Sequence, residues 1–138
     1  MHSYTRRINY YETDKMGITH HSNYVRFMEE ARIDYLEQIG VSYGQMEKDG
    51  VISPVIGIEC EYKRPTTFAD ELIIHVEIEE YKKLKLTVSY RMINARTGEL
   101  VFTGKSFHCF ISSQGSPVAL AAQHPDYDRA LRSAVKEG

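Results

Sequence analysis

Alternation of apolar and polar residues with a period of two is the most constraining feature of this sequence. It occurs in three successive segments, whose apolar positions are Ile56, Ile58, Cys60 and Tyr62, then Leu72, Ile74, Val76 and Ile78, then Leu84, Leu86, Val88, Tyr90 and Met92. Such alternation is typical of a β-strand, in which every second side chain points to the same face. The links 64–70 and 82–83 are shorter than the dozen or so residues of a parallel crossover. The segments therefore predict an antiparallel sheet with one apolar and one charged face.

Two more strands extend this sheet. Residues 99–111 continue it, and we expect a β-bulge near Gly104, where the alternation breaks. Residues 4–11 are interpreted as a short first strand. A loop at 112–117 then separates a C-terminal tail, in which Asp126 can cap a short helix that packs on the sheet.

A long amphipathic helix precedes the alternating segments. Its apolar residues recur at helical spacing, at positions 24, 27, 28, 31, 35, 36 and 39. Ser22 or Asn23 can cap its start, and Gly40 fits its end. At 1.5 Å per residue the span 23–39 is about 25 Å long, enough to cross a curled sheet. The predicted fold class is α+β, with one helix covering the apolar face of a five-stranded antiparallel sheet.

Length and composition narrow the classes of protein to consider. The 138 residues suit one domain, 1–138, and a chain of this size can bury about 68% of its unfolded surface without a disulfide or metal. The formal net charge of −2 argues against nucleic-acid and anionic-membrane partners. No apolar run approaches the roughly 20 residues that span a bilayer, and the N-terminus lacks a signal-peptide core. We therefore expect a cytoplasmic protein with Cys60 and Cys109 reduced, Cys60 being a buried structural thiol.

The segment between the first strand and the helix concentrates the groups that can carry chemistry. Residues 10–24 read YYETDKMGITHHSNY and lead directly into the helix. Unpaired N–H groups and the positive end of the helix dipole favour developing negative charge there. A carboxylate such as Asp14 can attack a carbonyl carbon or activate water. Asp14 fits a turn-capping role equally well on the residues alone.

The motif Asp14-x-x-Gly17-x-x-x-His21-x-x-Tyr24, followed by Glu29/Glu30-Ala31-Arg32, resembles the opening motif of hotdog-fold acyl-CoA thioesterases. The subfamily it resembles is the 4-hydroxybenzoyl-CoA and Tol-Pal-associated type, and the resemblance covers nearly the whole chain. It implies a sheet wrapped around a long central helix, and an enzyme that hydrolyses acyl-CoA to free acid and CoA. It also implies that Asp14 is the catalytic carboxylate and that the start of the helix polarises the thioester carbonyl.

The predicted site follows from this resemblance. The catalytic residues are Asp14 and His21, and the substrate-binding residues are Gly17, Asn23 and Tyr24, with Ser89 and Thr103 beside the pantetheine channel. His20 stands where an aromatic residue is frequent in the family, so the identity of the acting imidazole is open, although the spacing favours His21. Whether Asp14 attacks directly or through water is open too. No metal or other cofactor is required, since the histidines complete no recognised ligand spacing.

The coenzyme and the sheet edge point to further partners. The CoA phosphates need basic residues, and the candidates are Lys63 with Arg64, the group Lys82, Lys83 and Lys85, and Arg91. Glu29 and Glu30 lie off the apolar stripe, which favours a surface or interface role, although some hotdog thioesterases carry their carboxylate on this helix.

One helix over five strands leaves a sheet edge exposed and little depth for a large coenzyme. Proteins of this type pair edge to edge, which implies a homodimer or homotetramer.

Three other functions remain open on the sequence. The chain could hydrolyse acyl carrier protein thioesters instead of acyl-CoA. A hotdog dehydratase or hydratase would place a histidine and a carboxylate in different motifs. A non-catalytic acyl-CoA-binding module would be favoured by loss of the acid, yet Asp14 is present.

Overall fold

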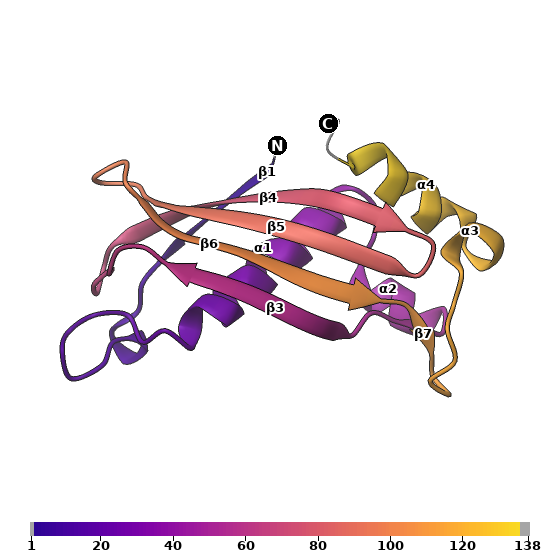
Figure 1. Ribbon diagram of the computed structural model, residues 1–138, viewed down its shortest axis with the longest axis horizontal. Helices are drawn as coiled ribbons and strands as arrows, with labels where there is room; N and C mark the ends of the chain where they lie inside the picture. Colours follow the sequence, from indigo (N-terminus) through magenta and orange to yellow (C-terminus); the bar gives the residue numbers. More distant parts are fainter. Residues whose placement is uncertain (1, 136–138) are drawn as a thin grey trace.

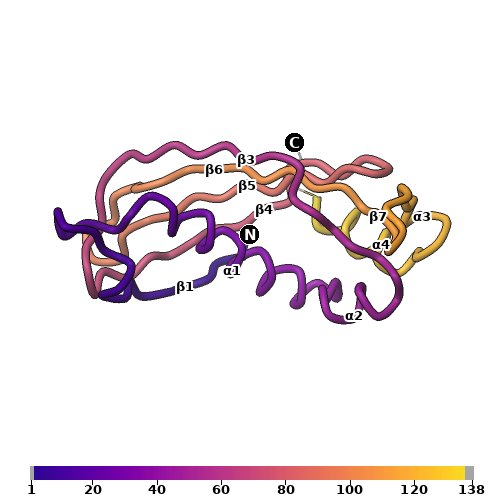
Figure 2. The backbone as a smooth tube through the Cα atoms, turned by 90° about the horizontal axis from the view of Figure 1, so that it is seen from below, coloured from indigo at the N-terminus to yellow at the C-terminus, as the bar shows by residue number. Residues whose placement is uncertain are grey.

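The computed structural model describes residues 2–135 and shows one long helix, α1 (Asn23–Gln38), across one face of an antiparallel sheet (Figures 1 and 2). The strands are β1 (His2–Arg7), β3 (Val55–Tyr62), β4 (Glu71–Lys82), β5 (Lys85–Asn94) and β6 (Leu100–Cys109), in the spatial order β1-β4-β5-β6-β3. The shorter elements are the 3-10 helix η1 (Tyr10–Glu12), the helices α2 (Tyr43–Lys48), α3 (Leu120–Gln123) and α4 (Pro125–Ala134), and the paired strands β2 (Val51–Ile52) and β7 (Ile111–Ser112). This arrangement confirms the predicted α+β class.

The face of the sheet that α1 covers forms the core. On β4 the four predicted apolar positions, Leu72, Ile74, Val76 and Ile78, are fully buried, and they share one cluster with the apolar stripe of α1. Full burial of such a side chain contributes about 1.5–3 kcal/mol. The helix ends one residue before the predicted boundary, where Gly40 adopts a φ of +93° that favours glycine. The predicted helix and the predicted strand β4 are therefore confirmed.

The expected irregularity of β6 is present, but it lies at Val101, between Leu100 and Phe102, and not at Gly104 itself. Gly104 pairs in register with Cys60 on β3 and Tyr90 on β5. A Cβ atom at this position would lie 2.9 Å from the carbonyl oxygen of Glu59 and 3.0 Å from the Sδ atom of Met28. The alternation breaks here because the Phe102 ring, the Glu59 carbonyl on β3 and the Met28 side chain of α1 leave no room for a Cβ atom.

Gly104→Ala is therefore expected to destabilise the fold by about 1–3 kcal/mol, because the added methyl group would press against the Phe102 ring and the Glu59 carbonyl on β3. Thermal and urea unfolding would measure the loss. Gly57→Ala is the matched control, since a Cβ atom there meets Phe107 at an ordinary 3.5 Å. Equal stability of the two variants would contradict this explanation.

The first strand is shorter than predicted. It ends at Arg7, and Tyr10–Glu12 form η1 instead of a continued strand. The buried carboxylate of Glu12 accepts a hydrogen bond from the backbone N–H of Asn9 at 2.8 Å and pairs with the Arg6 guanidinium at 2.6 Å. Because the Asn9 N–H bonds to Glu12 in a local turn, it does not bond to a neighbouring strand, and the chain leaves the sheet there.

The apolar face of β3 is largely exposed, which corrects the expectation that it is buried. Ile56, Ile58 and Tyr62 are 54%, 44% and 49% exposed, and Cys60 is only half-buried. β3 is an edge strand, and α1 does not cover its outer margin. The exposed side chain of Val25 on α1 lines the same groove as Ile56 and Ile58. An unpaired strand edge therefore lies beside an exposed apolar surface.

The C-terminal helix forms, although two residues earlier than predicted. α4 begins at Pro125, and the position that caps it is His124, not Asp126. Asp128 accepts hydrogen bonds from the Tyr81 hydroxyl at 2.6 Å and from Arg132 Nε at 2.9 Å, which fastens α4 to β4. Within residues 2–135, no helix is long and apolar enough to cross a membrane.

Candidate active site

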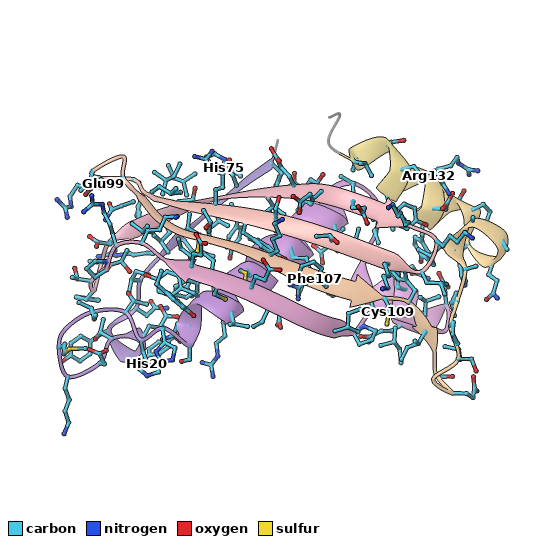
Figure 3. The ribbon with its side chains drawn as sticks, in the orientation of Figure 1. His20, His75, Glu99, Phe107, Cys109 and Arg132 are labelled. Atoms are coloured by element: carbon cyan, nitrogen blue, oxygen red, sulfur yellow. The ribbon has the colours of Figure 1, made fainter. Side chains whose placement is uncertain are left out.

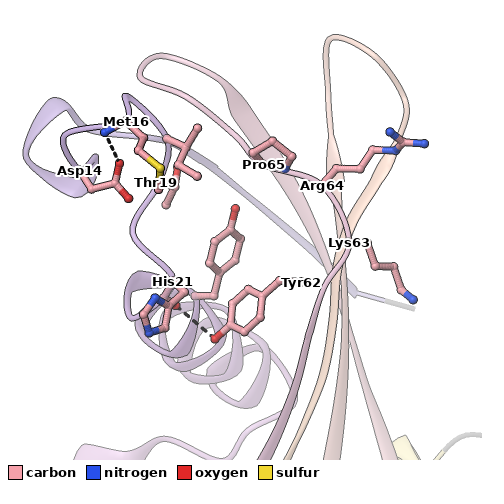
Figure 4. A pocket seen from close by; sticks show the side chains of 10 residues that line it. Asp14, Met16, Thr19, His21, Tyr62, Lys63, Arg64 and Pro65 are labelled. Carbon is pink, nitrogen blue, oxygen red and sulfur yellow. Dashed lines mark hydrogen bonds between the residues drawn. The ribbon is translucent and has the colours of Figure 1, made fainter.

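A pocket of about 380 Å³ lies at the start of α1 (Figure 4). It is lined by Asp14, Met16, Ile18, Thr19, His21 and Tyr24 from the loop and helix, and by Tyr62, Lys63, Arg64 and Pro65 from the end of β3. The fold thus brings together Asp14, His21 and Tyr24, as the sequence predicted. It also places Lys63 and Arg64, two candidates for the CoA phosphates, on the opposite wall.

The loop that carries Asp14 is a tight hairpin-like turn. The Asp14 N–H donates to the Ile18 carbonyl, and the Gly17 N–H donates to the Asp14 carbonyl, both at 2.9 Å. Gly17 has a φ of +79°, which a side chain would strain. Gly17 does not line the pocket, so its place in the structure is that of a turn residue and not of a substrate contact.

The structure shows the turn-capping contact of Asp14 and leaves its other carboxylate oxygen open. Its Oδ1 atom accepts a hydrogen bond from the Met16 N–H at 2.8 Å, which is the turn-capping arrangement. Within residues 2–135 its Oδ2 atom accepts no hydrogen bond. The cap fixes the side chain, and the second oxygen is left for chemistry in the pocket.

The tandem histidines have different surroundings. The His21 ring lines the pocket, whereas His20 Nδ1 lies 2.9 Å from the Ser22 hydroxyl on the outside of the turn (Figures 3 and 4). The His21 carbonyl accepts a hydrogen bond from the Tyr62 hydroxyl at 3.3 Å, which joins the turn to β3. His21 is therefore the imidazole beside Asp14 in the pocket.

The backbone N–H groups at the start of α1 are not equivalent. The Asn23 and Tyr24 N–H groups donate within the turn, to the carbonyls of His20 at 3.0 Å and His21 at 3.2 Å. The Ser22 N–H faces His20 Nδ1 at 3.2 Å. Within the described chain the His21 N–H donates no hydrogen bond. The predicted set of carbonyl-polarising amides, 21–24, narrows to His21.

The Asn23 side chain is directed to the backbone and does not line the pocket, unlike the substrate contact the sequence predicted. Its Nδ2 atom donates to the Glu12 carbonyl at 3.0 Å and to the His20 carbonyl at 3.3 Å. The side chain is only 7% exposed. It ties the two ends of the catalytic loop together.

A chain of hydroxyl groups under the pocket was missed from the sequence. The Tyr24 hydroxyl lies 2.9 Å from Thr66 Oγ1, which lies 2.7 Å from Thr19 Oγ1. The Tyr24 ring stacks on Phe102, and burial raises the pKa of the Tyr24 hydroxyl, so it stays neutral. Thr66 gave no sequence signal, because its partners are more than forty residues away in the chain.

Ser89 and Thr103 lie elsewhere. They line a groove of about 550 Å³ with Arg91, Lys105 and three glutamates, on the sheet face opposite α1. The candidate lysines 82, 83 and 85 lie at the turn between β4 and β5, at the end of the sheet away from Asp14 (Figure 1). Glu30 pairs with Arg6 on β1 at 3.0 Å, while Glu29 lines the groove between α1 and β3. None of these residues joins the Asp14 pocket.

Comparison with known proteins identifies the family of this chain. The sequence profile of the Thioesterase-like superfamily matches residues 8–133. YneP of Bacillus subtilis (strain 168), provisionally named an acyl-CoA thioesterase, is 35% identical over 130 residues, 94% of each chain. The acyl-CoA thioester hydrolase YbgC of Escherichia coli O157:H7 is 32% identical over 89 residues, 64% of this chain and 66% of YbgC. The structure of DHNA-CoA thioesterase from Staphylococcus aureus matches with a TM-score of 0.90 and 33% identity, over 95% of this chain and 88% of that one.

The chain belongs to the thioesterase-like superfamily, and its fold is the hotdog fold. The family-level resemblance noted in the sequence is thereby confirmed.

Proposed function

We propose that this chain hydrolyses acyl-CoA thioesters to a free acid and CoA. The observation that carries the proposal is the pairing, in one pocket, of an Asp14 carboxylate with an open oxygen and a helix start whose His21 N–H has no partner within residues 2–135. Thioester hydrolysis needs these two parts, a nucleophile or base and a donor for the oxyanion. The acyl-CoA thioesterase relatives support the same reaction.

The reaction can start in two ways from this geometry. Asp14 attacks the carbonyl carbon, expels the CoA thiolate and forms an anhydride that water cleaves, or Asp14 takes a proton from the water that attacks. In both, the carbonyl oxygen becomes negative and the His21 N–H, at the positive end of α1, stabilises it. A general base contributes about 10²–10⁴-fold, and one oxyanion donor about 10²–10³-fold. Single turnover in ¹⁸O-water separates the routes, because only direct attack can place ¹⁸O in Asp14.

His21→Ala is expected to lower kcat by less than tenfold, in contrast to the much larger loss from Asp14→Asn. The variant keeps the main-chain N–H that polarises the carbonyl and loses only the ring. The thiolate is moreover a leaving group that departs without a strong acid, since thiol pKa values lie near 8.5. Steady-state thiol release would test this. A loss as large as that of Asp14→Asn would show that the imidazole itself transfers a proton.

The working unit we propose is a homodimer, or a homotetramer built from it, of single-domain chains. The unpaired edge of β3 and the exposed Ile56, Ile58 and Tyr62 support this, because an edge strand with an apolar flank is a template for pairing. A separate groove lies between α1 and β3 and is lined by Val25, Glu29 and Ile58 among others. A second copy would cover this groove, so the acyl group would bind between subunits. Contact of Ser89 and Thr103 with pantetheine would then be to coenzyme held by a neighbouring copy.

The finer assignment we propose is the 4-hydroxybenzoyl-CoA and Tol-Pal-associated type, acting in the cytoplasm, with Lys63 and Arg64 meeting the CoA phosphates. Both cations are exposed and held only by surface partners, Glu61 at 3.0 Å and Glu99 at 2.9 Å. Thiol release from aromatic, short-chain and long-chain acyl-CoA, and from the matching acyl carrier protein thioesters, tests this assignment. Hydration of crotonyl-CoA without thiol release would overturn the proposed reaction.

A further inference from the structure

We infer that Asn23 is a positioning residue: its side chain orients the His20–His21 peptide group so that the His21 N–H faces the substrate carbonyl. The inference rests on the proposed function, because it names the side chain that holds the proposed oxyanion donor, the His21 N–H, in position. Asn23 itself touches no part of the pocket. Its effect would act entirely through the backbone it holds.

The geometry starts from the His20 carbonyl. This oxygen accepts two hydrogen bonds from one residue, from the Asn23 N–H at 3.0 Å and from Asn23 Nδ2 at 3.3 Å. In a trans peptide the C=O and the next N–H point in opposite directions. Holding the His20 oxygen toward Asn23 therefore points the His21 N–H away from Asn23.

The same two bonds strengthen the donor. A carbonyl that accepts hydrogen bonds polarises its amide, which makes the N–H of that peptide a better donor in a low-dielectric site. The His21 N–H gains from this without a competing internal acceptor. An oxyanion donor that is fixed and polarised in advance is what lowers the barrier most.

Asn23 also fixes the carboxylate end of the loop. Its Nδ2 donates to the Glu12 carbonyl at 3.0 Å, and that oxygen accepts the His20 N–H at 2.8 Å as well. Glu12 lies two residues before Asp14. It is buried, and its carboxylate accepts hydrogen bonds from the Arg6 guanidinium and from the Asn9 N–H. The Asn23 side chain therefore adds to the backbone hydrogen bonds that hold Asp14 in position relative to the His21 N–H.

The contacts require a side chain with two N–H donors. Two carbonyl oxygens face Nδ2, and a primary amide supplies two N–H bonds at that atom. Aspartate of the same shape would put a negative oxygen against both carbonyls. Alanine would leave both carbonyls without this donor.

The test compares Asn23→Ala and Asn23→Asp with the wild type on benzoyl-CoA, with Asn9→Ala as the matched control. Asn9 stands at the cap of η1, and its side-chain Nδ2 donates to the exposed Tyr11 hydroxyl at 3.1 Å, away from the His20 and His21 peptide groups. We expect kcat to fall about ten- to a hundredfold in both Asn23 variants, because a misplaced oxyanion donor loses part of the effect that a missing donor would lose entirely. KM should change less than threefold. Asn9→Ala should keep the wild-type kcat.

A second readout separates positioning from a merely structural role. With the slow Asp14→Asn enzyme, the isotope-edited infrared band of the bound benzoyl-CoA carbonyl should shift to lower frequency than in water, and adding Asn23→Ala should remove most of that shift. The melting temperature reports whether each variant is folded, and Asn23→Ala serves if Asn23→Asp unfolds. An unchanged kcat, or a shift that survives in the double variant, would overturn the inference alone. A wild type that releases no thiol would overturn the proposed function together with it.

Discussion

Asp14→Asn is expected to lower kcat for thioester hydrolysis by about 10²–10⁴-fold while leaving the fold intact. Asparagine keeps the Oδ1 acceptor that the Met16 N–H uses at 2.8 Å, so the turn persists. It replaces the open Oδ2 by an amide nitrogen, which neither attacks a carbonyl nor takes a proton from water. Thiol release under saturating substrate would measure kcat, and thermal unfolding would show whether the fold is intact.

The control for this experiment is Asp14→Ala. That variant loses the Oδ1 cap as well, and we expect both inactivity and a lower melting temperature, since a lost cap costs about 1 kcal/mol. Wild-type turnover by a folded Asp14→Asn enzyme would contradict the assignment of Asp14 under either route of attack.

Ile58→Asp is expected to convert the protein to monomers and to abolish most of its hydrolysis. Ile58 is exposed on the inner face of β3, where a second copy would bury it, and an unpaired charge in such an interface costs several kcal/mol. Light scattering would give the mass in solution, and thiol release the activity at the same concentration. The chain itself should stay folded, because Ile58 lies outside the core beneath α1.

Glu59→Gln is the matched control for Ile58→Asp. Glu59 is the next residue of β3, points to the opposite face and lines the groove on the outer side of the sheet. We expect it to keep the mass of the wild type in solution. A fully active monomeric Ile58→Asp variant would show that one chain carries a complete site.

Local sequence patterns were enough to predict the helix and the strands. Which strand lies at the edge of the sheet, and which residues pack closely, depends on contacts between distant parts of the chain. The helix over 23–38 and the strand β4 were predictable, because each repeats its apolar residues at its own period. The alternation of β3 identified the correct apolar face, yet it could not show that β3 lies at the edge, where that face is exposed. The break at Gly104 reflects close packing by the Glu59 carbonyl on β3 and by Met28 of α1, contacts with no signature in neighbouring residues.

The residues of the candidate site were likewise predictable only where they lie close together in the sequence. Asp14, His21 and Tyr24 were predictable because they lie in one continuous motif before α1. Tyr62 and Thr66 reach the pocket from the end of β3 and the loop beyond it, so only the folded chain shows their contribution. Asn23 was placed correctly in the loop but given the wrong contact, since a side chain that donates to backbone cannot be told from one that binds substrate by spacing alone.

Quantifying both products from benzoyl-CoA and the purified wild-type protein tests the central claim most directly. We expect free CoA and benzoate in equal amounts over many turnovers, with formation about 10²–10⁴-fold slower in Asp14→Asn. Benzoyl-CoA that binds tightly and is recovered intact would contradict the claim that this pocket hydrolyses thioesters.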